Sequence, residues 1–218
     1  MKNLLLMLLL LGINQIGLTQ ESNNSPTLPR TGIKTALLGS LIYPGLKVGV
    51  ERPYKIIQVD KEKKWGIKTI LKERYLTANL GYYYHPNFHD NLYLLLERQK
   101  RRQHMNGWFT ETAPGIGFSR TFLGDEAYAV SDEGQVDKLS LAGHNYALVS
   151  LSVGLGYNFE IKLGQPLKIY TKASLLGMFP SNSDLYLRPT IELGVAFSTS
   201  SFLPATPKLL NKHKTKRS

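Results

Sequence analysis

The chain has 218 residues, a formal net charge of +11, 19 glycines, 12 tyrosines and no cysteine. This length is enough for one domain of moderate size or one barrel. Without cysteine there is neither a disulfide framework nor the lipid-attachment site of a lipoprotein. Beyond the first residues no window approaches about 18 consecutive apolar positions, which argues against a helical inner-membrane protein.

The first residues predict an exported protein. Lys2 precedes an apolar run, residues 4–13, which is too short to cross a bilayer as a helix. This pattern is typical of a cleaved secretory signal, and a retained anchor is the alternative. We place the signal peptide at residues 1–19. Residues 20–43 are predicted to be a disordered linker, because the stretch 21–31 is polar and carries two prolines.

From residue 44 to residue 198 apolar residues alternate with small or polar ones. A period of two predicts strands, because successive side chains of a strand point to opposite faces. In chain order, the firm strands are predicted around residues 46–51, 76–84, 92–97, 108–119, 146–162, 167–175 and 185–197. In the basic stretch 52–74 we expect a strand, a charged turn at 60–64 and a second strand that begins near Trp65, from which an eighth strand of the barrel could come.

The clearest of these strands is 146–162. Its odd positions are all apolar, whereas its even positions from 150 onwards are Ser, Gly, Asn, Glu or Lys. It is far longer than a usual strand, and a tilted strand needs only about 9 to 11 residues to cross the hydrocarbon of a bilayer. Because a bacterial single-chain barrel has an even number of strands, we expect eight. The predicted fold is therefore all-β, an antiparallel up-and-down transmembrane β-barrel.

Three local features interrupt this pattern. Pro114 cannot donate to a β-ladder, so a bulge or a local break is expected there. The longest connection, residues 124–144, contains a small hairpin at 130–136 with its turn at 132–134. The pattern stops at residue 198, and residues 199–218 form a basic tail without any acidic residue.

Glycine indicates which face is inside. Alternation alone does not separate a membrane barrel from a soluble one, because both have one apolar face. Seven glycines lie on the face opposite the apolar side chains: Gly49, Gly81, Gly115, Gly117, Gly154, Gly156 and Gly194. On the outside of a soluble barrel they would only weaken strands, whereas inside a narrow barrel they make room for large side chains and allow curvature. We therefore expect the polar face to line the lumen.

The same parity directs nine charged side chains into the lumen. An eight-stranded barrel is wide enough only for its own side chains. Each buried charge therefore needs a partner, and we expect a plug of ion pairs rather than a charged conduction path. The nine residues are Lys47, Glu51, Glu97, Glu111, Glu160, Lys168, Lys172, Arg188 and Glu192.

The residues that carry a family resemblance are the signal segment, the sequence Gly-Leu-Gly-Tyr-Asn-Phe at 154–159 and the last strand, Thr-Ile-Glu-Leu-Gly-Val-Ala-Phe at 190–197. Together with the alternating strands, they resemble the small outer-membrane β-barrel proteins of Gram-negative bacteria over residues 44–198. The resemblance implies that the barrel-assembly machinery reads an aromatic residue of the last strand, here Phe197 or Phe202. The expected interfacial aromatics are Tyr82, Tyr84, Trp108, Phe118, Phe122, Tyr157, Phe159 and Phe197.

Catalytic and metal chemistry find little support in the sequence. His85, His89 and Asp90 lie within six residues, which allows a metal site, but a solvated turn is the preferred interpretation and no metal is predicted. His144 has Ser140 and Ser150 nearby without forming a recognisable motif. We therefore expect neither an enzyme nor a cofactor, and a barrel enzyme that modifies the acyl chains of lipid A is the alternative.

The excess of positive charge calls for an anionic partner. Nucleic acid is not expected, because an exported barrel does not meet it. Seven basic residues are candidates for contacts with lipopolysaccharide phosphates, the alternative being solvated turns. They are Lys61, Lys63, Lys64, Arg98, Lys100, Arg101 and Arg102. The basic tail is a candidate for contact with anionic cell-wall polymer.

The sequence thus predicts an integral outer-membrane β-barrel with a structural, adhesive or ligand-binding role exerted through its loops. A soluble periplasmic barrel that carries an apolar ligand is the other alternative.

Overall fold

The computed structural model describes residues 30–40, 43–63, 66–85, 89–124, 127–130, 134–139, 141–180, 185–199 and 207–214. The predicted signal peptide lies outside this part of the chain. The elements are β1 Thr31–Ser40, β2 Tyr43–Lys63, β3 Gly66–His85, β4 His89–His104, β5 Trp108–Leu123, β6 Ala127–Val130, β7 Val136–Leu139, β8 Asn145–Asn158, α2 Glu160–Leu163, β9 Leu167–Phe179, β10 Tyr186–Thr199 and β11 Lys208–Lys214. No helix in these ranges has the length and apolar character needed to cross a membrane.

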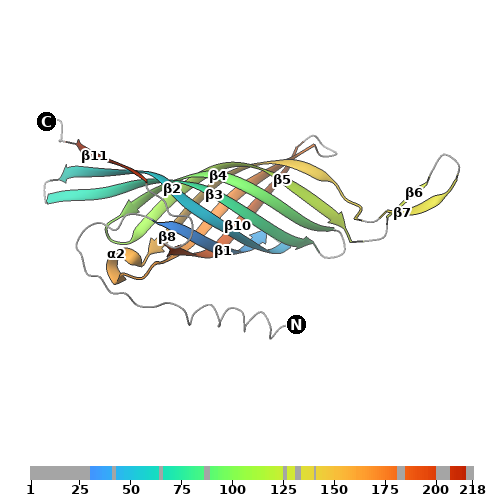
Figure 1. The fold of residues 1–218 in the computed structure, drawn as a ribbon, viewed down its shortest axis with the longest axis horizontal. Helices are drawn as coiled ribbons and strands as arrows, with labels where there is room; N and C mark the ends of the chain where they lie inside the picture. Colours follow the sequence, from blue (N-terminus) through green and yellow to red (C-terminus); the bar gives the residue numbers. More distant parts are fainter. Residues whose placement is uncertain are drawn as a thin grey trace.

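Eight of the strands form a closed ring (Figure 1). The order is β1-β10-β9-β8-β5-β4-β3-β2, and pairing of β2 with β1 closes it. Each neighbouring pair in the ring is antiparallel. The protein is thus nearly all β with a ring of eight strands, as the sequence predicts.

The two ends of the ring differ. At the terminal end β1 begins and β10 ends, with Thr31 opposite Thr199. The same end carries α2, β11 and the tip of the β2–β3 hairpin, whereas the opposite end, the loop end, carries the separate β6–β7 hairpin (Figure 1).

The first strand of the ring lies where the sequence predicts a linker. β1 occupies 31–40 and pairs with both β10 and β2, so that Leu37 lies opposite Leu193 and Leu46. The predicted linker 20–43 and the predicted barrel start at residue 44 are therefore wrong for this stretch. The alternation is weak here because Ala36 and Leu38, on the inward face, are as apolar as the outward-facing residues.

The charged stretch 52–74 does not supply an extra strand. β2 continues through it to Lys63 and β3 begins at Gly66, so the predicted strands at 46–51 and 76–84 are the barrel halves of two strands of 21 and 20 residues. A register shift between Pro53 and Lys55 separates the barrel part of β2 from its extension. The charged hairpin thus projects from the terminal end.

The end of one predicted strand moves at that end of the ring. β8 stops at Asn158, and the last residues of the predicted strand 146–162 form α2. The Asn158 side chain accepts a hydrogen bond from the Glu160 backbone N–H (3.1 Å), and Gly164, with φ 67°, ends the helix in a left-handed conformation that suits glycine. This local hydrogen bonding competes successfully with the strand pattern.

Part of the predicted basic tail is also a strand. β11 pairs in parallel with β2, from Lys208 opposite Lys55 to Lys214 opposite Lys61. The β1–β2 ladder ends at Gly32 opposite Glu51, so β2 has an open edge beyond that point. β11 covers this edge and satisfies its backbone N–H and C=O groups. Residues 208–214 of the predicted basic tail are therefore part of the sheet.

Two local predictions are confirmed. The β6–β7 hairpin lies inside the connection 124–144, and Gly134 in its turn has φ 83°. The ladder between β4 and β5 runs to Glu97 opposite Gly115 and resumes at Lys100 opposite Thr112, so pairing is interrupted at Pro114.

The charged and polar side chains of the barrel point inward, together with an apolar cluster that includes Leu95, Leu148 and Met178, whereas the outer wall is apolar. Outward-facing Ile116 and Leu193 are 67% and 60% exposed, whereas inward-facing Glu51 and Lys172 are 0% and 1% exposed. Glycines make room for inward tyrosines: a Cβ at Gly194 would lie 2.5 Å from Cζ of Tyr170, and one at Gly81 would overlap the Tyr93 ring. The predicted orientation of the two faces is confirmed.

Candidate functional site

The lumen contains the buried charged residues of the described part of the chain. Inward positions of seven ring strands supply five glutamates and six basic residues, all buried. They are Lys34, Lys47, Glu51, Glu73, Glu97, Arg101, Glu111, Lys168, Lys172, Arg188 and Glu192. Alternation places them there, because every second side chain of a barrel strand points inward.

One network centres on Arg101 of β4. Its Nη2 lies 2.9 Å from Glu51 Oε2 and 3.0 Å from Glu111 Oε2, and its Nε donates to the same Glu111 oxygen at 3.1 Å. The guanidinium lies between two rings, with Cζ 4.7 Å from the Tyr75 centroid and 4.5 Å from that of Phe109. A second cation also contacts Glu51, because Lys168 Nζ lies 3.2 Å from Glu51 Oε1. Such a fork between carboxylates is a strong and directional arrangement.

A second network centres on Glu97. Lys172 Nζ lies 2.9 Å from its Oε1, and the Asn79 amide and the Ser152 hydroxyl donate to it at 2.9 and 3.2 Å. Lys47 pairs with Glu192. Both networks thus join buried charged side chains from different strands of the ring.

Eight of the nine residues predicted for the lumen lie on ring strands and are buried there. Arg188 lies over the Tyr83 ring, with Cζ 3.2 Å from the centroid. Glu160 does not belong to the set, because it is half-buried on α2 at the terminal end. Burial raises the pKa of Glu160, and the positive charge of Lys168 opposes this shift.

Three lumen residues, Arg101, Glu73 and Lys34, are not among the nine predicted from the sequence. Arg101 was expected to contact lipopolysaccharide, which is wrong, because it is 3% exposed in the lumen. Arg101 lies four residues after Glu97 on the same strand, and this even spacing directs both side chains to the same face. Glu73 lies in the charged stretch, and Lys34 lies in the predicted linker. Lys34 Nζ is 4.9 Å from the Tyr170 centroid and, among the described residues, has no hydrogen-bond partner.

At the loop end the lumen opens into a small mouth pocket of about 220 Å³. Three histidines from different segments meet Arg188 there. His85 and His89 have ring centroids 5.2 Å apart, and His144 comes from the long connection. The residues around the pocket are Tyr83, His85, His89, Thr121, Leu123, His144, Tyr146, Met178, Tyr186 and Arg188.

The mouth pocket combines three histidines with one arginine. Burial lowers the pKa of His89, and the neighbouring His85 and Arg188 lower it further, while Asp90 opposes the shift. In the described ranges no group of three His, Cys, Asp or Glu side chains has a metal-binding arrangement. The two histidines that the sequence singled out thus share a site with Arg188.

The remaining basic candidates lie on the outer surface at the terminal end. Arg98, Lys100 and Arg102 are exposed on β4, and Lys61 lies near the tip of β2. Lys64 and the side chain of Lys63 lie outside the described part. Aromatic side chains occupy both ends of the outer wall: Tyr82, Tyr84 and Phe118 lie towards the loop end, whereas Trp108, Tyr157 and Phe159 pack together at the terminal end.

The fold and the lumen define the class of the molecule, a closed ring of eight strands with an apolar exterior and a charged interior. No protein-family model matches the chain, and no curated protein does. Among solved structures, the chain is similar to the crystal structure of the β domain of the Bordetella autotransporter BrkA, with 9% sequence identity and a TM-score of 0.30. That match covers 78% of this chain and 99% of the other.

Proposed function

We propose that the protein is an integral outer-membrane β-barrel with an ion-paired, non-conducting lumen, and that it acts through its loop end as a structural, adhesive or ligand-binding protein. The observation that carries the proposal is the inverted distribution of side chains. Along β8, for example, Leu151, Val153 and Leu155 are 61%, 56% and 49% exposed, while Ser150 and Ser152 point inward and are buried. A continuous apolar outer wall is costly in water and stable in lipid.

The orientation follows from the two ends of the ring. Outer-membrane barrels have short periplasmic turns and longer extracellular loops. At the terminal end only residues 105–107 join β4 to β5, whereas the connection 124–144 with the β6–β7 hairpin lies at the loop end. We therefore place the terminal end in the periplasm and the hairpin outside the cell.

The mouth pocket is then the part of the lumen that an external ligand reaches. Arg188 supplies positive charge for an acidic ligand, and the ion pairs below the pocket block passage through the barrel. We propose no catalytic role. The alternative of a soluble barrel with an apolar ligand is disfavoured, because the apolar side chains of the wall face outward and buried charged residues occupy much of the described inward face.

Membrane fractionation and gel mobility test this proposal. The protein is expected in the outer-membrane fraction, to require detergent for extraction, and to migrate differently in unheated and boiled samples. Planar-bilayer recording should show no stable conductance. A monomer that stays dispersed in buffer without detergent would overturn the membrane assignment, and a stable, sizeable conductance would overturn the closed lumen.

A further inference from the structure

The outer surface of β2, β3 and β4 changes abruptly from apolar to basic near the terminal end. Register places Arg52, Leu76 and Arg98 in one row across these strands, Lys55, Arg74 and Lys100 in the next, and Lys72 with Arg102 beyond them. These seven basic residues, here called the basic face, are exposed or half-buried. In the described residues of these rows no acidic side chain shares that outer face.

A groove begins where the basic face meets the apolar wall. It has a volume of about 730 Å³ and is lined almost entirely by apolar atoms. Val50, Ala78, Leu96 and Ile116 form one row of it. Pro114, where the β4–β5 ladder is interrupted, also lines the groove.

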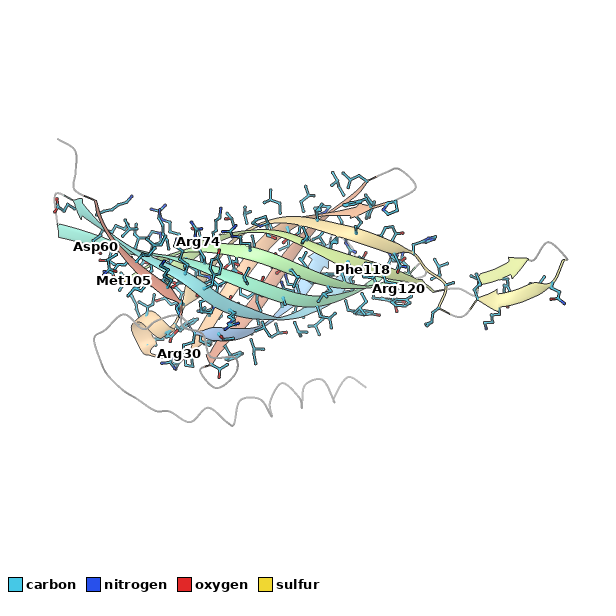
Figure 2. The ribbon with its side chains drawn as sticks, turned by 45° about the horizontal axis from the view of Figure 1, so that its top comes forward. Arg30, Asp60, Arg74, Met105, Phe118 and Arg120 are labelled. Carbon is cyan, nitrogen blue, oxygen red and sulfur yellow. The ribbon has the colours of Figure 1, made fainter. Side chains whose placement is uncertain are left out.

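Arg52 and Arg98 lie at the margin of the groove that borders the basic face. Both arginines line the groove in the row next to the apolar one. Arg98 Nε donates to the Tyr54 hydroxyl at 3.0 Å, which steadies the guanidinium from across β3. In Figure 2, Arg74 lies towards the terminal end of the outer wall, whereas Phe118 and Arg120 lie towards the loop end.

An apolar groove with two arginines at one margin matches an amphiphile with an acyl chain and an anionic headgroup. We infer that the groove and the basic face bind an anionic phospholipid of the leaflet at the terminal end. One acyl chain lies along Val50, Ala78 and Leu96, and the phosphate lies between Arg52 and Arg98. Arginine suits this role because its planar fork holds phosphate oxygens in pairs, and clustered basic residues near a membrane surface favour anionic lipid.

This inference rests on the proposed membrane location, and it replaces lipopolysaccharide as the partner of Arg98, Lys100 and Arg102. Lipopolysaccharide belongs to the outer leaflet, which the proposed orientation places at the other end of the barrel. The phosphate chemistry is shared, so the test must separate the two lipids.

Native mass spectrometry of the detergent-solubilised, full-length protein tests the inference, with phosphatidylglycerol, phosphatidylcholine and lipid A titrated separately. The wild type is expected to retain one phosphatidylglycerol and to bind phosphatidylcholine roughly tenfold more weakly. R52Q/R98Q should remove this preference. A78F, which fills the groove without changing charge, should weaken both phospholipids. The matched control R120Q/K138Q loses two positive charges at the loop end and should bind as the wild type does.

Equal binding of the two phospholipids by the wild type would overturn the inference, as would an equal loss in R52Q/R98Q and the control. A preference for lipid A over phosphatidylglycerol would assign the groove to lipopolysaccharide instead. Heat-dependent gel mobility of each variant shows whether the barrel has folded. Its loss in the wild type would refute the membrane barrel itself, whereas its retention together with equal lipid binding would refute only the phospholipid site.

Discussion

Glu97 on β4 and Lys172 on β9 meet across the lumen, with Lys172 Nζ 2.9 Å from Glu97 Oε1 and 3.0 Å from Oε2. β5 and β8 separate these two strands in the ring, so the pair spans the interior rather than following the wall. Both side chains are 0% exposed. The contact therefore ties opposite sides of the barrel together.

Breaking this pair is expected to destabilise the barrel strongly. Lys172→Met leaves the Glu97 carboxylate buried without its ammonium partner, and removing one member of a buried pair costs about 3–5 kcal/mol. Lys34→Met is the matched control, because Lys34 is also a buried lumen lysine but its Nζ has no hydrogen-bond partner among the described residues. Urea unfolding in detergent, followed by gel mobility, measures the difference. Equal losses in the two variants would contradict a specific role for the Lys172–Glu97 pair.

Because Gly81 packs against the Tyr93 side chain, we expect a smaller residue at position 93 to restore folding of a Gly81 variant. All three atoms nearest to a Cβ at Gly81 belong to the Tyr93 side chain, whereas at Gly117 they belong to the backbone of Leu94 and Leu95. Gly81→Ala should therefore impair folding, and Tyr93→Leu should restore it. Gly117→Ala should impair folding too, but Tyr93→Leu should not help. Yield of the heat-modifiable form reports each case, and rescue of both glycine variants would refute this steric explanation.

The apolar wall predicts a position-dependent cost for charge. Leu151 and Leu163 are 61% and 62% exposed, but Leu151 faces outward on β8 and Leu163 lies on α2 at the terminal end. Leu151→Arg should cost about 2–4 kcal/mol of folding free energy in lipid, as expected for a basic residue near the bilayer midplane. Leu163→Arg should cost little. Equilibrium folding into phosphatidylcholine vesicles measures both, and a similar cost at the two sites would argue against the membrane-spanning orientation.

The mouth pocket predicts a loss of stability in acid. The pKa of His89 is lowered in the folded protein, chiefly by burial and then by His85 and Arg188. The unfolded chain, with an ordinary histidine pKa of about 6.5, therefore binds the proton first as the pH falls. Stability attributable to neutral His89 is present above that pH and is lost as the pH falls towards the folded pKa. Between pH 8 and pH 5 the wild type should lose more stability than His89→Gln, and identical pH profiles would exclude this role.

Removing β11 is expected to open the edge of β2. A chain truncated after residue 206 leaves residues 55–61 of β2 without the parallel partner that covers them. Hydrogen exchange of their backbone amides should accelerate, while exchange in β8 and β9 stays unchanged. Unchanged protection of 55–61 would show that the pairing is not maintained in solution. Pull-down of cell-wall polymer with the same truncation tests the proposed role of the basic tail.

The sequence by itself determined the local geometry and the two faces of the wall. Period-two alternation over residues such as Val149 to Leu155 is a property of neighbouring side chains, so it is readable without the fold, and it placed eight of nine predicted charges in the lumen. The break at Pro114 followed from the missing N–H of proline in the same local way.

Only the tertiary structure decided which segments close the ring and which charges meet. β1 has weak alternation and becomes a strand because β2 and β10 offer it two open edges, and β11 forms because β2 extends beyond β1. The even spacing of Arg101 from Glu97 predicts that Arg101 faces the lumen, but it does not predict its partners. Glu51 and Glu111 come from other strands. Strand closure and ion pairing depend on contacts between residues distant in the sequence, which local alternation does not encode.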